Sequence, residues 1–389
     1  MITGDNVETA RAIAYSIGLV GSLDAPINTP DAIVLTSPEF NARFDRLEAL
    51  RPGGDATRAE REVIARGLTG LRVLARARPL DKYKMVQLLQ EQEQVVAMTG
   101  DGTNDAPSLK KADVGLAMGI AGTEVAKEAS KIVLLDDAFS TIVKAVQWGR
   151  SLYENIQRFI QFQLTINVSA LTIAFLGPFL GVRPPFTVLQ LLWINVIMDT
   201  FASIALCSEP PREEVMRLPP KRKDENILTR SMLYTIFGTA AFFVVIMLTL
   251  LLGMEYRGWF DPNWLPRDQW TEAYGKTSQS SAFPELTVRQ VSIFFAVYVF
   301  FQVWNQINCR SLVPQVSGLK NLFANPTFLT IAGTVAVVQV LLTQLPFLGA
   351  VFKVEPLQLT DWLWIIAGTS SVLLFAEVWR RVRLATGKA

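Results

Sequence analysis

The sequence predicts a mixed protein in two parts: a parallel α/β domain over residues 1–150, followed by a bundle of six transmembrane helices over residues 151–389. Half of the 389 residues are hydrophobic and only 19% are charged, which is more apolar than a soluble chain of this length usually is. Charged residues occur throughout the first part, whereas long apolar runs dominate the second. Strand-like and helix-like segments also alternate from residue 72 to residue 135.

The second part contains six apolar runs that are long enough, or nearly so, to cross a bilayer as a helix of about 20 residues. The runs are Phe159–Leu180, Phe186–Leu206, Met232–Leu252, Val288–Ile307, Phe328–Leu345 and Trp362–Val378. The last run is short, and we expect flanking residues to extend it. Six runs in so short a stretch do not fit a buried soluble core. Because six is an even number, both ends of this part are expected on one side of the membrane.

The distribution of basic residues predicts which side that is. The link after the second run carries Arg212, Arg217, Lys221, Arg222, Lys223 and Arg230, and the chain end carries Arg380, Arg381, Arg383 and Lys388. The link after the first run holds only Arg183. Because cytoplasmic loops are enriched in Lys and Arg, both termini are predicted to be cytoplasmic. Trp259, Trp264 and Trp270 then lie outside and are predicted to anchor the membrane interface.

In the first part, the alternation of elements predicts a parallel sheet built from right-handed βαβ units. The expected strands are Val73–Arg76, Val95–Thr99, Asp113–Met118 and Ile132–Leu135, and the expected helices are Asp81–Glu93 and Thr123–Ser130. Residues 20–70 carry no usable motif. The segment Ser140–Phe175 has no proline and one glycine, Gly149, which predicts a single helix joining the two parts.

Composition excludes several classes of site. The chain has no histidine, which rules out Ser-His-Asp triads, HExxH zinc sites and histidine general bases. Its only cysteines, Cys207 and Cys309, are too few for a disulfide framework or a Cys-rich metal site, and we expect free thiols. A net charge of +2 gives no support for a nucleic-acid partner. The first residues lack a signal-peptide pattern.

The turn Thr99–Asp105, with the sequence TGDGTND, follows a predicted strand, at the sheet edge where ligands bind in parallel α/β folds. Two carboxylates four residues apart suit Mg²⁺, which prefers oxygen ligands and shares them with phosphate. We expect Asp101 to be a direct ligand and Asp105 a second ligand or the holder of a coordinated water. Asn104 is suited to donate to a phosphate oxygen, and Lys82 to neutralise a phosphoryl group. The alternative is a glycine-closed turn without a ligand.

A second candidate, Thr3-Gly4-Asp5-Asn6, opens a helical run at Val7–Leu19. Its alternative is structural, with Asp5 as an N-cap only.

Polar residues within the apolar runs form a candidate ion site. Asp199 lies inside the second run, where an ionisable group is costly and usually functional. Asn195 is one helical turn earlier, on the same predicted face, and Asn167 lies in the first run. One carboxylate and two amides form part of a cage for Ca²⁺, which takes six to eight oxygens. The alternative is that these groups hydrogen-bond between helices. Gln302, Asn305 and Asn308 leave the same two alternatives open.

Four strings together resemble P-type cation-transporting ATPases. They are ITGDN (residues 2–6), ARARPLDKYKMVQLLQ (75–90), MTGDGTNDAPSLKKADVGLAMG (98–119) and LLWINVIMDTFASIALCSEPP (191–211). The resemblance covers nearly the whole chain, more loosely after residue 310. It implies that the first part is a partial haloacid-dehalogenase-like phosphorylation domain and that the cofactors are Mg²⁺ and ATP.

The resemblance also assigns roles to individual residues. By position, Asp101 resembles the Mg²⁺ ligand of this family, with Asn104 and Asp105 as its neighbours, and Lys82 resembles the lysine that contacts the phosphoryl group. Thr3, Gly4, Asp5 and Arg76 are assigned on the same basis to nucleotide and phosphate binding.

The membrane string is most similar to calcium pumps of the plasma-membrane type. Reticulum-type calcium pumps carry glutamates at the positions of Ala170 and Gln302. Their absence here implies one Ca²⁺ site, around Asn195 and Asp199, and a multi-pass protein of the plasma membrane. Other transported cations, Mn²⁺ or a monovalent ion, remain alternatives.

The sequence departs from the family in lacking DKTGT, which holds the phosphorylated aspartate, the TGE loop, the nucleotide-binding domain and the first four spans. We therefore expect the C-terminal portion of a pump, with Met1 internal to a longer protein and the N-terminal half as its partner. The chain alone is expected to be inactive. A truncated, non-catalytic membrane protein is the alternative from a different class.

Overall fold

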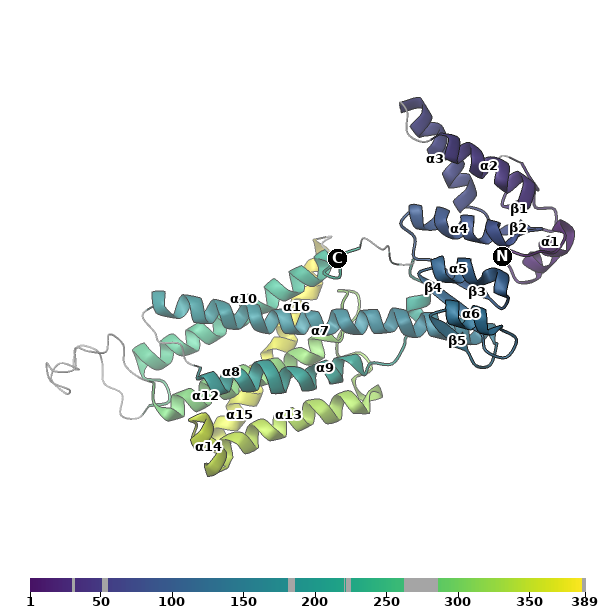
Figure 1. Cartoon of the computed structure of the whole chain (residues 1–389). Helices are drawn as coiled ribbons and strands as arrows, with labels where there is room; N and C mark the ends of the chain where they lie inside the picture. Colours follow the sequence, from purple (N-terminus) through teal and green to yellow (C-terminus); the bar gives the residue numbers. More distant parts are fainter. Residues whose placement is uncertain are drawn as a thin grey trace. The chain divides into compact units, whose positions relative to one another are not determined.

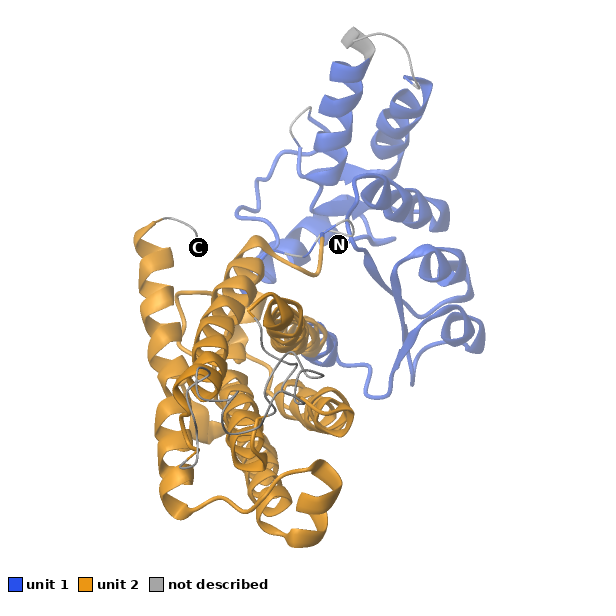
Figure 2. Ribbon diagram, turned by 90° about the vertical axis from the view of Figure 1, so that its left-hand side faces the viewer, with its two compact units in different colours: residues 1–146, 217–225 blue, residues 147–216, 226–389 orange. Residues whose placement is uncertain are grey.

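The computed structural model describes residues 1–29, 32–50, 55–180, 186–219, 221, 225–261 and 286–386. The chain divides into two compact units, one of residues 1–146 with 217–225 and one of residues 147–216 with 226–389 (Figure 2). Several residues used above for orientation lie outside the described ranges, namely Arg183, Arg222, Lys223, Trp264, Trp270 and Lys388.

The strands of the first unit pair in parallel, as predicted, but they form two small sheets instead of one. In one sheet β1 (Val34–Thr36) pairs with β2 (Val73–Ala75), and in the other the order is β3 (Ala97–Gly100), β4 (Val114–Met118), β5 (Ile132–Leu134). The split has a local reason. Ile2 forms a parallel bridge to Leu74, so the N-terminal segment and β1 together occupy both hydrogen-bonding edges of β2.

Within the described part of this unit, six α-helices accompany the strands (Figure 1): α1 (Val7–Ser16), α2 (Ser37–Ala49), α3 (Asp55–Thr69), α4 (Pro79–Glu91), α5 (Ala106–Lys111) and α6 (Glu124–Ala129). The segment that lacked a motif therefore contributes β1, α2 and α3. Leu35, Phe40 and Leu74 are fully buried in one apolar cluster, and burial of such side chains contributes roughly 1.5–3 kcal/mol each.

A buried carboxylate fixes the start of α4. Asp81, 2% exposed, accepts hydrogen bonds from Ser37 Oγ at 2.6 Å, Asn41 Nδ2 at 2.7 Å and the Arg78 backbone N–H at 2.8 Å. Burial by itself raises the pKa of Asp81, but these three donors and the charge of Lys84 outweigh it, so the pKa lies below its ordinary value. Asp81 thus ties the first turn of α4 to α2.

The second unit is helical in its described residues. Its α- and π-helices there are α7 (Phe139–Phe179), α8 (Val188–Leu192), a π-helical segment (Trp193–Met198), α9 (Asp199–Cys207), α10 (Arg230–Arg257), α12 (Val288–Cys309), α13 (Pro326–Gln344), α14 (Pro346–Phe352), α15 (Leu359–Thr369) and α16 (Ser371–Ala385) (Figure 1).

Six stretches of described helix are long and apolar enough to cross a membrane, which confirms the predicted spans. The second consists of α8, the π segment and α9, and the last consists of α15 and α16, so flanking residues extend the short sixth run as expected. Helix α7 runs unbroken over 41 residues, about 60 Å at 1.5 Å per residue, which confirms the single helix predicted between the two parts.

Helix α12 is the centre of the bundle. It packs against α9, α10, α13, α15 and α16, and 78% of its membrane span is buried. Phe294, Phe295, Tyr298 and Phe301 are fully buried. Tyr298 shares a hydrogen bond of 2.9 Å with Ser169 of α7, so α12 is joined to α7 by a polar contact as well as by packing.

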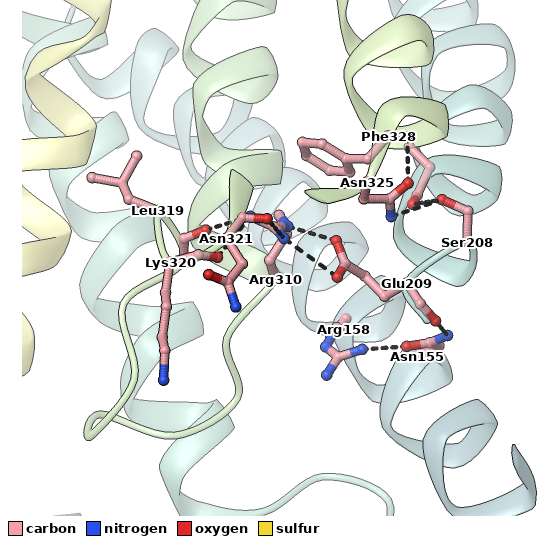
Figure 3. A network of polar contacts seen from close by, with 12 residues as sticks. Asn155, Arg158, Ser208, Glu209, Arg310, Leu319, Lys320, Asn321, Asn325 and Phe328 are labelled. Atoms are coloured by element: carbon pink, nitrogen blue, oxygen red, sulfur yellow. Dashed lines mark hydrogen bonds and ion pairs between the residues drawn. The ribbon is translucent and has the colours of Figure 1, made fainter. Parts of the chain in front are cut away.

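A second polar network joins the helix ends that lie near Arg310 (Figure 3). The Arg310 guanidinium is 8% exposed, pairs with Glu209 at 2.5 Å, and donates to the carbonyls of Gly318 and Asn321 at 2.8 and 3.2 Å. Next to it, Asn325 caps α13 and also donates to Ser208 at 3.2 Å. The buried charge of Arg310 is therefore paired and hydrogen-bonded, as burial of a charge requires.

We predict that Asp81→Ala lowers the free energy of opening α4 by about 2 kcal/mol at pH 7, because the mutation removes an N-terminal cap and leaves buried donors unpaired. Amide hydrogen exchange of Pro79–Glu91 should then be roughly 30-fold faster than in wild type.

The difference should shrink at low pH. Since the pKa of Asp81 is depressed, its contribution is complete above the unfolded-state value of about 3.9 and is lost as pH falls through the lower folded-state pKa. Asp45→Ala is the control, because Asp45 also contacts α4 through Lys84 but is exposed; its effect should stay within about 1 kcal/mol. Equal exchange in wild type and Asp81→Ala at pH 7 would contradict the assignment.

Candidate functional site

The structure brings together two of the predicted phosphate-site residues, Lys82 and Asp105. Lys82 follows Asp81 in the first turn of α4, and Asp105 ends a 3-10 turn, Thr103–Asp105, that leads into α5. Lys82 Nζ donates to Asp105 Oδ1 at 2.7 Å, and the two side chains are 23% and 8% exposed. The ammonium group thus sits at the carboxyl end of β3, directed at the GDGTND turn.

The turn needs a glycine at residue 100. A Cβ atom at Gly100 would lie 2.7 Å from Asp105 Cβ and 2.8 Å from Asp105 Oδ2, closer than two such atoms can approach without movement. The small residue at the end of β3 therefore lets Asp105 fold back to meet Lys82. Gly102, in the same turn, has no such contact, since its nearest neighbour is 3.9 Å away.

Asp101 and Asn104 are exposed on the same turn. The Asp101 backbone carbonyl accepts from the Thr123 N–H at 2.9 Å, which fixes the backbone beside α6 and leaves the carboxylate at the surface. Within the described residues, no group of three His, Cys, Asp or Glu side chains gathers as a metal site. The residues present nevertheless fit Mg²⁺, because two carboxylates are enough when water and phosphate complete the shell.

The Thr3–Asp5 segment forms its own local structure. Thr3 Oγ1 donates to Asp5 Oδ2 at 2.8 Å, and the Arg76 backbone N–H donates to the Asp5 carbonyl at 2.9 Å. Arg76 has a left-handed backbone with φ of 52°, which is unusual for a residue other than glycine and marks a sharp turn after β2.

The structure also excludes the alternative in which Asp5 is the N-cap. Asn6 caps α1, and its side chain accepts from Thr9 N at 2.9 Å. Asp5 is exposed, and Thr3 is half-buried. Among the described residues, no hydrogen bond links Thr3 or Asp5 to Lys82, Asp101 or Asp105. The Thr3–Asp5 segment follows the bridge residue Ile2, whereas Asp101 and Asp105 follow β3.

The intramembrane candidates differ in exposure. Asp199 begins α9 and is buried, with 8% of its surface exposed, and its Oδ1 has no hydrogen-bond partner among the described residues. Asn167 of α7 is half-buried, and Asn195, in the π-helical segment, is exposed on the surface of this chain. π-Helical segments often occur at functional sites, and this one immediately precedes the buried carboxylate.

Further buried amides have no hydrogen-bond partner within the part of the chain that the structure describes. Both polar atoms of Gln302 and of Gln306 on α12, and of Gln339 on α13, are unpartnered, although each residue is 0% exposed. The sequence analysis did not single out Gln306 or Gln339. The signal that could have found them is a glutamine within an apolar run. Asn308 donates to the Val372 carbonyl at 3.3 Å, which favours the packing alternative for that residue.

With this geometry established, comparison with known proteins defines the class. The family model described as "Cation transporting ATPase, C-terminus" matches residues 183–382. The chain belongs to the cation-transporting ATPase family and corresponds to its C-terminal portion. The resemblance to P-type pumps drawn from the motifs is confirmed.

Among similar proteins are plasma membrane calcium-transporting ATPase 3 of Homo sapiens and ATPase 1 of Mus musculus. Each is 39% identical over 383 residues, which cover 97% of this chain and 29% of the relative. Plasma membrane calcium-transporting ATPase 2 of Oreochromis mossambicus shows the same identity, with 32% of its length covered. The chain thus spans about a third of the length of these relatives.

We predict that Gly100→Ala displaces Asp105 and breaks its pairing with Lys82, at a cost of about 1–3 kcal/mol in stability. Chemical labelling of lysines should show Lys82 reacting faster, relative to exposed Lys110, than it does in wild type. Gly102→Ala, where a Cβ meets only ordinary contacts, should leave the labelling ratio unchanged. An unchanged ratio in Gly100→Ala would show that the turn does not depend on this close approach.

Proposed function

We propose that this chain is the C-terminal portion of an ATP-driven P-type pump that exports Ca²⁺ from the cytosol across the plasma membrane through an aspartyl-phosphate cycle. The observation that carries the proposal is Asp199, a buried carboxylate inside an apolar span of a chain that belongs to the cation-transporting ATPase family. The names of its relatives, plasma membrane calcium-transporting ATPases, support Ca²⁺ as the ion.

On this proposal residues 1–150 are the distal part of a haloacid-dehalogenase-like phosphorylation domain. Lys82 holds its charge toward the phosphoryl group, and Asp105 keeps the lysine directed there through the 2.7 Å contact. Asp101 holds Mg²⁺, and Asn104 donates to phosphate. When bound, Mg²⁺ neutralises phosphate charge. Thr3, Gly4, Asp5 and Arg76 contribute to nucleotide and phosphate binding.

Residues 151–389 are, on the same proposal, the six C-terminal membrane helices with both termini in the cytoplasm. Asp199, Asn195 and Asn167 supply oxygens to one Ca²⁺ ion, and the remaining ligands come from water, backbone and the absent part of the pump. The exposure of Asn195 is consistent with a neighbouring helix contributed by that part. Helix α7 carries Asn167 and is continuous with the segment that follows β5.

In the complete pump we predict that Asp199→Asn abolishes Ca²⁺-dependent phosphorylation, because an amide does not supply the negative charge that a Ca²⁺ site requires. The measurement is acid-stable labelling from labelled ATP as a function of Ca²⁺ concentration, with Mn²⁺ and monovalent ions as separate arms. Thr200→Val is the control, since the Thr200 hydroxyl is engaged with the Val196 carbonyl; it should retain wild-type Ca²⁺ dependence. Unchanged Ca²⁺ dependence in Asp199→Asn, or dependence on Mn²⁺ or a monovalent ion in wild type, would overturn the assignment.

The 389-residue chain by itself should take no acid-stable label from labelled ATP, because no DKTGT sequence occurs in it. Adding the N-terminal half of a related pump as a separate chain should leave this chain unlabelled and place any label on the added half. Stable labelling of the present chain alone would refute the domain assignment, since the nucleophile would then lie within residues 1–389.

A further inference from the structure

The second unit contains an apolar pocket that the transport proposal does not use. Its volume is about 330 Å³, within the usual range of ligand pockets, roughly 300–1,000 Å³. Three membrane helices form its walls, with Ile246 and Leu250 from α10, Val297 and Phe301 from α12, and Ile365 from α15. Trp259 and Trp364 also line it and are 45% and 77% exposed.

The walls of the pocket are held by specific contacts. Gln290 of α12 donates to the carbonyls of Met254 and Trp259 at 3.2 and 3.0 Å. The Trp259 ring lies against Gly253, where a Cβ atom would approach to 2.2 Å. Thr369, which also lines the pocket, accepts from the Trp304 indole N–H at 3.1 Å. The hydroxyls of the two lining threonines, Thr249 and Thr369, are therefore engaged by protein, and the pocket offers water few partners.

The surroundings decide what fills this space. Most of the lining side chains are apolar, and these walls belong to helices that are long and apolar enough to cross a membrane. Tryptophan is enriched at the membrane interface, where its ring meets lipid and its N–H meets headgroups. Trp259 and Trp364 thus place the open end of the pocket near headgroup level, so a hydrocarbon chain that enters it keeps its polar end beside them.

Arg289, which contacts a lining residue of the pocket but does not line it, offers a contact for an anion. Asp361 lines the pocket and binds Arg289, whose Nη2 donates to both carboxylate oxygens at 3.0 and 3.1 Å. The Arg289 side chain is 32% exposed, and among the described residues its Nε and Nη1 have no hydrogen-bond partner. A guanidinium with free N–H groups suits a phosphate oxygen. Asp361 is itself held in the first turn of α15 by the Gln358 N–H.

We propose that this pocket binds one phospholipid molecule, with an acyl chain between α10, α12 and α15 and the headgroup phosphate at Arg289. The apolar walls account for the acyl chain, and the Arg289 N–H groups that have no partner among the described residues account for the phosphate. The proposal does not depend on the transported ion or on the phosphorylation chemistry, so it stands or falls separately from the proposed function.

Two glycines provide a matched test. A Cβ at Gly368, which lines the pocket, meets nothing within 4 Å, and the same is true of Gly333 on α13, which does not line it. Gly368→Leu therefore places a side chain in the pocket, whereas Gly333→Leu adds the same side chain elsewhere on the membrane surface. Val297→Phe is a second filling variant, should Gly368→Leu fail to fold.

The measurement is native mass spectrometry of the delipidated chain in detergent, titrated with dioleoylphosphatidylcholine, dioleoylglycerol or cholesterol hemisuccinate. Wild type and Gly333→Leu should retain one phosphatidylcholine, and the filling variants should bind it at least about tenfold more weakly, a loss of about 1.4 kcal/mol. Dioleoylglycerol, which has the same chains and no phosphate, should bind wild type several-fold more weakly than phosphatidylcholine.

Three outcomes would overturn the proposal. Equal retention in wild type and both filling variants would place the lipid elsewhere. An equal loss of phosphatidylcholine binding in Gly333→Leu and Gly368→Leu would indicate a general effect of adding a leucine to the membrane-facing surface. Equal binding of dioleoylglycerol, or preferential binding of the sterol, would show that the phosphate contact at Arg289 does not select the ligand.

Discussion

Hydrocarbon offers no hydrogen-bond partner, and this one constraint governs most of the second unit. It requires the spans to be helical, so that every backbone group is satisfied within its own helix. It also requires each polar side chain in a span to find protein, water or an ion. Arg310, just beyond the end of α12, is likewise paired, through Glu209 and several carbonyls (Figure 3). Asp199 Oδ1 and both polar side-chain atoms of Gln302 find no such partner among the described residues.

The first unit follows the same logic on a smaller scale. Asp81 is buried and accepts three hydrogen bonds, which fixes the start of α4. The next residue, Lys82, is then directed at Asp105, and Gly100 leaves room for the carboxylate to reach it. The Lys82–Asp105 ion pair thus depends on a buried carboxylate one residue before the lysine.

The sequence also supplied the candidate site residues, because motif residues and polar residues within apolar runs are visible in one dimension. It placed Lys82, Asp101 and Asp105 in one site, and Lys82 and Asp105 are in contact. It could not show that Asn6, and not Asp5, caps α1, since both residues are good caps and only backbone geometry separates them. It also missed Asp81, Gln306 and Gln339, because burial of a polar group depends on neighbours distant in the sequence.

The sequence by itself determined three features: the six candidate membrane spans, the unbroken helix α7 and the parallel pairing of the strands. Each of them depends on the length or period of a local pattern of apolar residues. Only the tertiary structure decided the division of the strands into two sheets, since that depends on Ile2 bridging to Leu74 across the chain. It alone also revealed the pocket between α10, α12 and α15 and the paired Arg289 and Asp361 at its open end. Such features arise where helices meet, and no single segment encodes them.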